Sequence, residues 1–162
     1  DVFNKYGFYD ERLIRNQDIE LNKRIVRGGG HIFIVPDTYC TYLARETFDG
    51  LAKNNFGNGK WNILTVYYTK QFKSLSVRHF IPLLFLLSLI VPSILACFYF
   101  PIGIISLISL LLYIFLISII SLSLALKKKL CFLYLMKAFV ILHMSYGWGS
   151  LVGIINMIGY RK

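Results

Sequence analysis

The residues best suited to acid–base chemistry lie in one short segment that contains Gln17, Asp18 and Glu20. A carboxylate within hydrogen-bond reach of a hydroxyl group can accept its proton as a general base. Apolar residues spaced among charged ones predict a helix over residues 18–27, which the following glycines end. Asp18 is then either a general base or a first-turn residue that the helix dipole stabilises. Glu20 falls on another face, where we expect a salt bridge with Arg24 at i+4.

Two further ionisable residues, Lys137 and His143, occur within the last long apolar segment of the chain. An ionisable group inside a membrane is a functional candidate, because placing it there is costly. Two structural explanations stand beside that one: a histidine that hydrogen-bonds a neighbouring helix, and a lysine whose chain extends to the membrane surface. The three cysteines have no metal-binding or disulfide spacing.

Long uncharged runs in the second half of the chain predict membrane helices. Residues 80–100 and 104–126 carry no charge, and each run is long enough as a helix to span the roughly 30 Å hydrocarbon layer. Pro82 falls in a first turn, where proline is tolerated, whereas Pro92 is expected to kink its helix. Residues 130–160 predict a third helix, either a full span or a helix in the membrane interface.

Basic residues flank these runs and set the expected orientation. Three lysines at 127–129 follow the second run, and Lys70, Lys73 and Arg78 precede the first. The positive-inside rule places both groups in the cytoplasm, as two crossings require. We therefore expect a multi-pass protein of the cell membrane, in contact with its lipids, whose first part is cytoplasmic. The net charge of +10 could suggest a nucleic-acid partner. Because the basic residues flank apolar runs, anionic lipid headgroups explain them more simply, and we expect no nucleic-acid partner.

The first half of the chain, which holds all eight acidic residues, has the pattern of an α/β domain. Residues 31–35 are β-branched and aromatic residues between glycines and Pro36, which predicts a buried strand. One helix and one strand cannot bury a core alone, so most of such a domain is expected upstream. The predicted division is an α/β part at 1–61, a basic linker or interface helix at 62–79, and a membrane region at 80–162.

Several short motifs occur in the order and spacing of one enzyme family. They are GFYDERL at 7–13, NQDIELNKR at 16–24, RGGGHI at 27–32, NGKW at 58–61, RHFIP at 78–82 and HMSYGWG at 143–149. Together they resemble the C-terminal region of membrane-attached family 2 glycosyltransferases, in particular the bacterial enzymes of exopolysaccharide assembly of the succinoglycan type. The resemblance implies the C-terminal part of a GT-A type catalytic domain followed by transmembrane helices.

The resemblance also implies an activity: inverting transfer of a sugar from a nucleotide-sugar donor to a lipid-linked or polysaccharide acceptor, in cell-surface polysaccharide biosynthesis. It assigns the general base to Asp18. Gln17 stands where the family often has glutamate, and its neutral amide is a candidate to hold the acceptor or to order the loop. Lys60 and Trp61 match the end of a motif that contacts the donor diphosphate and a sugar ring; lysine replaces arginine there, which favours single-sugar addition. Arg45 is a candidate phosphate contact. Ion pairing is the alternative for Arg45, and anchoring in the membrane interface is the alternative for Trp61.

The family further uses a divalent cation, Mg²⁺ or Mn²⁺, held by a D-x-D pair of carboxylates that this sequence lacks. The donor-binding strand is lacking too, so we expect residues 1–162 to be inactive alone. Lys137 is a candidate contact for a lipid pyrophosphate. The alternative interpretation is a non-enzymatic small membrane protein, a subunit or scaffold whose first half binds a partner.

Overall fold

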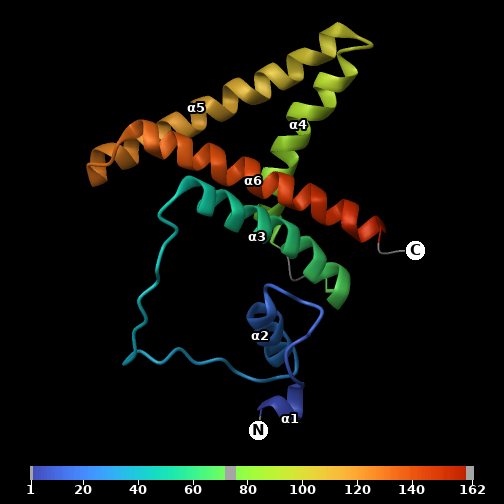
Figure 1. Cartoon of the computed structure of the whole chain (residues 1–162), viewed down its shortest axis with the longest axis vertical. Coiled ribbons are helices and arrows are strands. Elements are labelled where there is room, and N and C mark those ends of the chain that lie inside the picture. Colours follow the sequence, from blue (N-terminus) through green and yellow to red (C-terminus); the bar gives the residue numbers. More distant parts are fainter. Residues whose placement is uncertain (1, 72–75, 160–162) are drawn as a thin grey trace.

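The computed structural model describes residues 2–71 and 76–159, and these residues form helices joined by loops (Figure 1). The helices are α1 (Val2–Tyr6), α2 (Gln17–Arg27), α3 (Phe48–Thr69), η2 (Val77–Phe80), α4 (Ile81–Leu95), η3 (Phe100–Ile102), α5 (Gly103–Lys128) and α6 (Phe132–Gly159). The predictions for Lys73 and for the last residue of the 130–160 helix lie outside the described residues.

The α/β fold predicted from the sequence is wrong, because the described residues contain helices and no strand. Residues 31–35, predicted as a buried strand, follow an open path between α2 and α3 (Figure 1). Their side chains are exposed, and Ile34 is 91% exposed. A strand is stabilised by packing and pairing with a neighbouring strand. The described part of the chain provides none, so this β-prone run remains unpaired.

Helix α2 confirms the helix predicted over residues 18–27. It ends at Gly28, whose N–H donates to the carbonyl oxygen of Arg24 at 3.0 Å. Gly29 has a φ of +81°, a left-handed conformation that glycine adopts without strain. The predicted ion pair is also present, with 2.6 Å between Arg24 Nη2 and Glu20 Oε2. Glu20 is buried, and this pair joins two successive turns of α2.

Helices α3 and α6 lie side by side along most of α3 (Figure 1). Glycines allow this approach: a Cβ added to Gly149 would overlap the carbonyl oxygen of Phe56, and one added to Gly59 would overlap that of Tyr146. Small residues let helix backbones pack closely. Helix α3 is therefore packed directly against α6.

Three segments, Val77–Leu95, Phe100–Lys128 and Phe132–Gly159, are each long and apolar enough to cross a membrane. They correspond to the three apolar helices predicted from the sequence. Helices α4 and α5 form the predicted hairpin, in which Ser106 Oγ donates to the carbonyl oxygen of Leu89 at 2.9 Å. Pro82 lies in the first turn of α4, where a missing N–H is tolerated, and Pro92 lies inside the helix.

Candidate functional site

Arg15 fastens the loop before α2 to helix α3. Its guanidinium donates to the carbonyl oxygen of Asn54 at 3.0 Å and to the side-chain oxygen of Asn58 at 2.8 Å. A second nitrogen lies 3.3 Å from the side-chain oxygen of Asn54. These bonds are partly buried, where a charged donor is expected to contribute more than it does in water. The loop that leads into α2 is thus positioned by α3.

Asn16, the residue before α2, continues the attachment as far as α6. It has a φ of 65°, a left-handed conformation that asparagine tolerates better than most residues. Its side-chain amide donates to the side-chain oxygen of Asn62 on α3 at 2.9 Å. The amide of Asn62 donates in turn to the hydroxyl of Tyr146 on α6. A chain of hydrogen bonds therefore connects the start of α2 with α6.

Asp18 lies in the first turn of α2, two residues beyond this anchor. Its side chain is exposed, and no described residue forms a hydrogen bond or ion pair with it. The arrangement thus presents an unpaired carboxylate from a helix whose start is fixed. Such a group can accept a proton from a ligand that reaches it.

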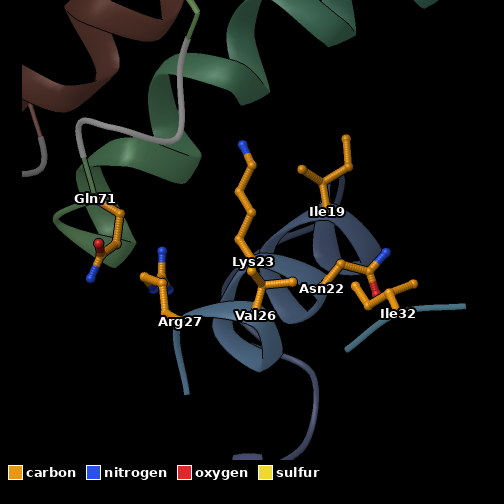
Figure 2. A pocket seen from close by; sticks show the side chains of 7 residues that line it. All are labelled: Ile19, Asn22, Lys23, Val26, Arg27, Ile32 and Gln71. Carbon is orange, nitrogen blue, oxygen red and sulfur yellow. The ribbon is translucent and has the colours of Figure 1, made fainter. Parts of the chain in front are cut away.

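A pocket of about 520 Å³ lies along α2 (Figure 2), and Ile19, the residue after Asp18, is part of its lining. Asn22 lines it, and because Asn22 follows Asp18 by four residues both side chains fall on neighbouring parts of one helix face. Arg27 and Gln71 complete its far end. The lining is mainly apolar, with amide and guanidinium donors from Asn22, Gln71 and Arg27.

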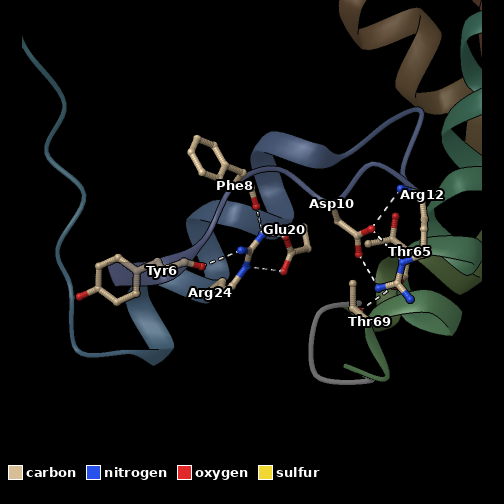
Figure 3. Close-up of polar contacts among 8 residues, drawn as sticks. All are labelled: Tyr6, Phe8, Asp10, Arg12, Glu20, Arg24, Thr65 and Thr69. Atoms are coloured by element: carbon tan, nitrogen blue, oxygen red, sulfur yellow. Dashed lines mark hydrogen bonds and ion pairs between the residues drawn. The ribbon is translucent and has the colours of Figure 1, made fainter. Parts of the chain in front are cut away.

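A second pocket of about 490 Å³ adjoins the first, with Arg27 and Gln71 lining both. Its walls carry two ion pairs (Figure 3). Asp10 accepts from Arg12 at 2.9 and 2.7 Å, and these hydrogen bonds hold the pKa of the Asp10 carboxyl below its usual value. The hydrogen bond to Glu20 raises the pKa of Arg24.

These ion pairs have a structural role in the loop that precedes α2. Arg24 also donates to the carbonyl oxygens of Tyr6 at 2.6 Å and of Phe8 at 2.9 Å. One guanidinium therefore joins α1, the following loop and α2. Since its donors are used within the protein, we assign Arg24 to positioning and not to ligand binding.

The structure does not gather the four predicted binding residues Gln17, Arg45, Lys60 and Trp61 at one site. The amide of Gln17 donates to the carbonyl oxygen of Leu13, so it orders the loop before α2. Arg45 is exposed in the segment before α3. Lys60 and Trp61 are half-buried on α3, and none of the four lines either pocket. Their proposed contacts with a donor remain predictions.

The two ionisable residues of α6 both contact aromatic rings. Lys137 Nζ lies 4.6 Å from the ring centre of Phe48, at the start of α3, in the geometry of a cation–π contact. His143 Nδ1 lies 3.1 Å from the hydroxyl of Tyr113 on α5. Lys137 therefore joins α6 to α3, and His143 joins it to α5.

The divalent cation implied by the resemblance has no fitting site here. Within residues 2–71 and 76–159, no three His, Cys, Asp or Glu side chains come together in a way that could hold a metal ion. No step of a reaction is assigned to a metal held by these residues.

Sequence reasoning missed the residues that attach α2, namely Arg15, Asn54, Asn58 and Asn62. A signal was available: the three asparagines recur at every fourth position, which places them on one face of a helix. An asparagine just ahead of a helix, as at Asn16, also indicates a cap position. Neither pattern identifies the partner across the fold, and the contact with Tyr146 is known only from the structure.

The described residues thus form helices joined by loops, and three of the helical segments are long and apolar enough to cross a membrane. The segment that contains α1 and α2 is attached to them through α3. No family model, curated protein or solved structure matches this chain.

Proposed function

We propose that this chain belongs to a membrane-bound enzyme that transfers a sugar, with inversion, from a nucleotide-sugar to a lipid-linked or polysaccharide acceptor. The reaction takes place at the cytoplasmic face of the cell membrane, in cell-surface polysaccharide biosynthesis. One observation supports this function above the others: Asp18 is an exposed, unpaired carboxylate on a helix that hydrogen bonds tie to a membrane-type helix. The motifs shared with family 2 glycosyltransferases supply the chemistry.

In this reaction an acceptor hydroxyl oxygen attacks the anomeric carbon of the donor sugar. The new carbon–oxygen bond forms on the face opposite the leaving group, and the bond to the diphosphate breaks with its electron pair. The hydroxyl proton passes to the carboxylate of Asp18, acting as general base. Asn22 and Arg27 line the adjacent pocket, where they can donate hydrogen bonds to acceptor hydroxyls.

Helices α4 and α5 are proposed to be the two crossings, with α6 lying in the membrane interface. Helix α3 follows α6 from Phe48, whose ring is 5.9 Å from that of Tyr134, to Lys60, whose carbonyl faces Gly153. If α6 crossed the bilayer, α3 would enter it as well, and Lys60, which follows the Gly59 packed against Tyr146 in the middle of α6, would lie near the bilayer centre. Charged residues at the bilayer centre cost roughly 2.5–3.5 kcal/mol each, or more. An interfacial α6 avoids this cost and leaves α3 with its charges near water.

The depth of α6 is tested by a cysteine placed near its end, Asn156→Cys, in a chain without the natural cysteines. In sealed vesicles of known orientation, an impermeant thiol reagent should reach this position from the cytoplasmic face. Modification from the opposite face alone would show that α6 crosses.

The activity is tested by Asp18→Asn in membranes that contain the full-length protein, supplied with a panel of nucleotide-sugars. We expect transfer to fall by about 10²–10⁴-fold, the usual contribution of a general base, while expression and membrane insertion persist. The matched control is Asp37→Asn, a change of another exposed aspartate, which should retain activity. Near wild-type turnover in Asp18→Asn would refute the assignment of the base.

A second candidate function, a non-enzymatic subunit or scaffold, is favoured by one observation. Residues 31–46 are exposed and make no backbone hydrogen bond to another backbone group in the described part of the chain, and Phe33, Ile34 and Tyr39 are 85%, 91% and 94% exposed. Such a segment suits a partner polypeptide. The enzyme predicts that the wild type transfers sugar and that Asp18→Asn loses this activity. The scaffold predicts no transfer by either protein.

A further inference from the structure

The side chain of Asn62, on α3, bridges the start of α2 and helix α6. Its oxygen accepts from the amide of Asn16 at 2.9 Å, and its own amide donates to the hydroxyl of Tyr146. An asparagine side chain suits this place because it has an acceptor and a donor at one end. Helix α6 is a firm support here, since a Cβ added to Gly59 would overlap the carbonyl oxygen of Tyr146.

Asn16 passes this contact on to the first turn of α2. Its side chain binds α3, while its carbonyl oxygen accepts from the N–H of Glu20 at 2.9 Å. The hydroxyl of Thr65 is a second acceptor for the Asn16 amide, but at 3.5 Å it lies beyond the usual hydrogen-bond distance. The direction in which α2 leaves α3 is therefore set at Asn16, and Asp18 lies two residues further on.

The other attachments of this region hold α2 close to α3 without fixing its orientation. Arg15 binds Asn58, one turn before Asn62 on α3, and a single attachment allows a helix to pivot about it. Leu13 and Leu21 are buried, but apolar contact is non-directional. The hydrogen bond to Asn62 supplies a second, directional point of attachment.

The carboxylate of Asp18 depends on this orientation. No described residue forms a hydrogen bond or ion pair with it, so its place is set by the backbone of α2. A general base has to come within about 2.6–3.2 Å of the atom whose proton it accepts. A displacement of about 1 Å, even one caused by a change far from the reacting atoms, can lower a rate by about 10²-fold.

We propose that Asn62 is a positioning residue for Asp18: acting through Asn16, it holds the base at a fixed place relative to Tyr146 on α6. This inference rests on the proposed function, in which Asp18 is the general base and α6 lies in the membrane interface. The reference point of the base is then a helix at the lipid surface, so the carboxylate keeps a constant height above the bilayer.

The test is a double-mutant cycle on kcat, measured with membranes that contain the full-length protein and a panel of nucleotide-sugars. Asn62→Leu removes both hydrogen bonds with little change in side-chain size, and kcat per folded protein should fall by about 10²-fold. In the Asp18→Asn background the same change should lower kcat no further, because residues that act as a unit are non-additive. Equal reductions in the two backgrounds would show a merely structural role and overturn the proposal.

The matched control is Asn55→Leu. Asn55 is also half-buried on α3, but its amide donates to the carbonyl oxygen of Leu51 within the same helix, so this variant should keep the wild-type kcat. If Asn62→Leu is not recovered folded, Tyr146→Phe replaces it in the cycle. That variant removes one hydroxyl, and kcat should fall by about two- to tenfold.

A second measurement requires no substrate. Spin labels at Ile19→Cys on α2 and Ile155→Cys on α6, both at exposed positions, report the distance between the two helices in a chain without the natural cysteines. The distribution of this distance should broaden in Asn62→Leu and stay as in the wild type in Asn55→Leu. An unchanged distribution in Asn62→Leu would overturn the proposal, whatever the transfer rate.

Failure of this inference and failure of the proposed function are distinguishable. If Asp18→Asn loses transfer while Asn62→Leu transfers like the wild type, the base assignment stands and the positioning role falls. If Asp18→Asn transfers normally, the base assignment falls, and with it the role of Asn62 in positioning a base. The distance between the labels then shows only whether Asn62 orients α2.

Discussion

The contact between α3 and α6 predicts a large difference between two identical substitutions in one helix. In Gly149→Ala the new Cβ would overlap the carbonyl oxygen of Phe56, so the two helix backbones must move apart. In Gly159→Ala, at the end of the same helix, no other part of the described chain lies within 4 Å of the new Cβ. Gly149→Ala also gains up to about 1 kcal/mol from the higher helix propensity of alanine, and this gain is smaller at Gly159, the last residue of α6.

Overpacking at Gly149 typically costs about 1–3 kcal/mol, and more where two backbones collide. For a chain of this length, 1 kcal/mol corresponds to roughly 2–4 °C in Tm. Since the helix propensity of alanine offsets part of this cost, we expect the unfolding midpoint of Gly149→Ala to fall by up to roughly 12 °C in detergent micelles, and that of Gly159→Ala to stay near the wild-type value. A Gly149→Ala protein as stable as the wild type would refute the close approach of α3 and α6.

Three further predictions concern polar contacts around α2. Asp10→Asn removes an ion pair with the partly exposed Arg12 and should cost less than about 1 kcal/mol of stability at neutral pH. Because folding lowers the pKa of Asp10, the difference in stability between variant and wild type should vanish as the pH falls below the usual value of 3.8. A difference that persists in acid would contradict this account of the pair. Glu20→Gln should destabilise by about 1.5–3 kcal/mol, whereas Asp49→Asn, at a pair with side chains 73% and 78% exposed, should change stability by less than about 0.5 kcal/mol; equal effects in chemical denaturation would count against the buried pair. In a double-mutant cycle, Asn62→Leu and Tyr146→Phe should be coupled by about 1 kcal/mol, and additive effects would exclude their hydrogen bond.

The helices were predictable where a single local pattern determined them. The apolar runs that became α4, α5 and α6 are long and almost free of charge, and a helix satisfies the backbone groups of such a run within the run itself. Helix α2 combines alternating charges, a stop at Gly28 and the Glu20–Arg24 spacing. In both cases the residues within one segment carry the whole signal.

The strand at 31–35 and the arrangement of the binding residues were not predictable in that way. Strand formation depends on a neighbouring strand, and the described part of the chain supplies none, so the propensity of Ile32 to Val35 has no structural consequence here. Similarly, the position of α2 is set by Arg15 and Asn16 binding α3 across 39 to 49 residues of sequence. Residue type shows that such groups need partners, but only the fold selects them.

The three natural cysteines provide the most direct measurement of the central claim, that Asp18 works on the membrane face where the lysines at 127–129 lie. Cys40 lies between α2 and α3, Cys97 lies at the tip of the α4–α5 hairpin, and Cys131 follows the lysines. All three are exposed. Variants that each retain one cysteine would be treated with an impermeant thiol reagent in sealed vesicles of known orientation. The account predicts that Cys40 and Cys131 are modified from the cytoplasmic face and Cys97 from the opposite face. Modification of Cys40 and Cys131 from opposite faces would contradict it.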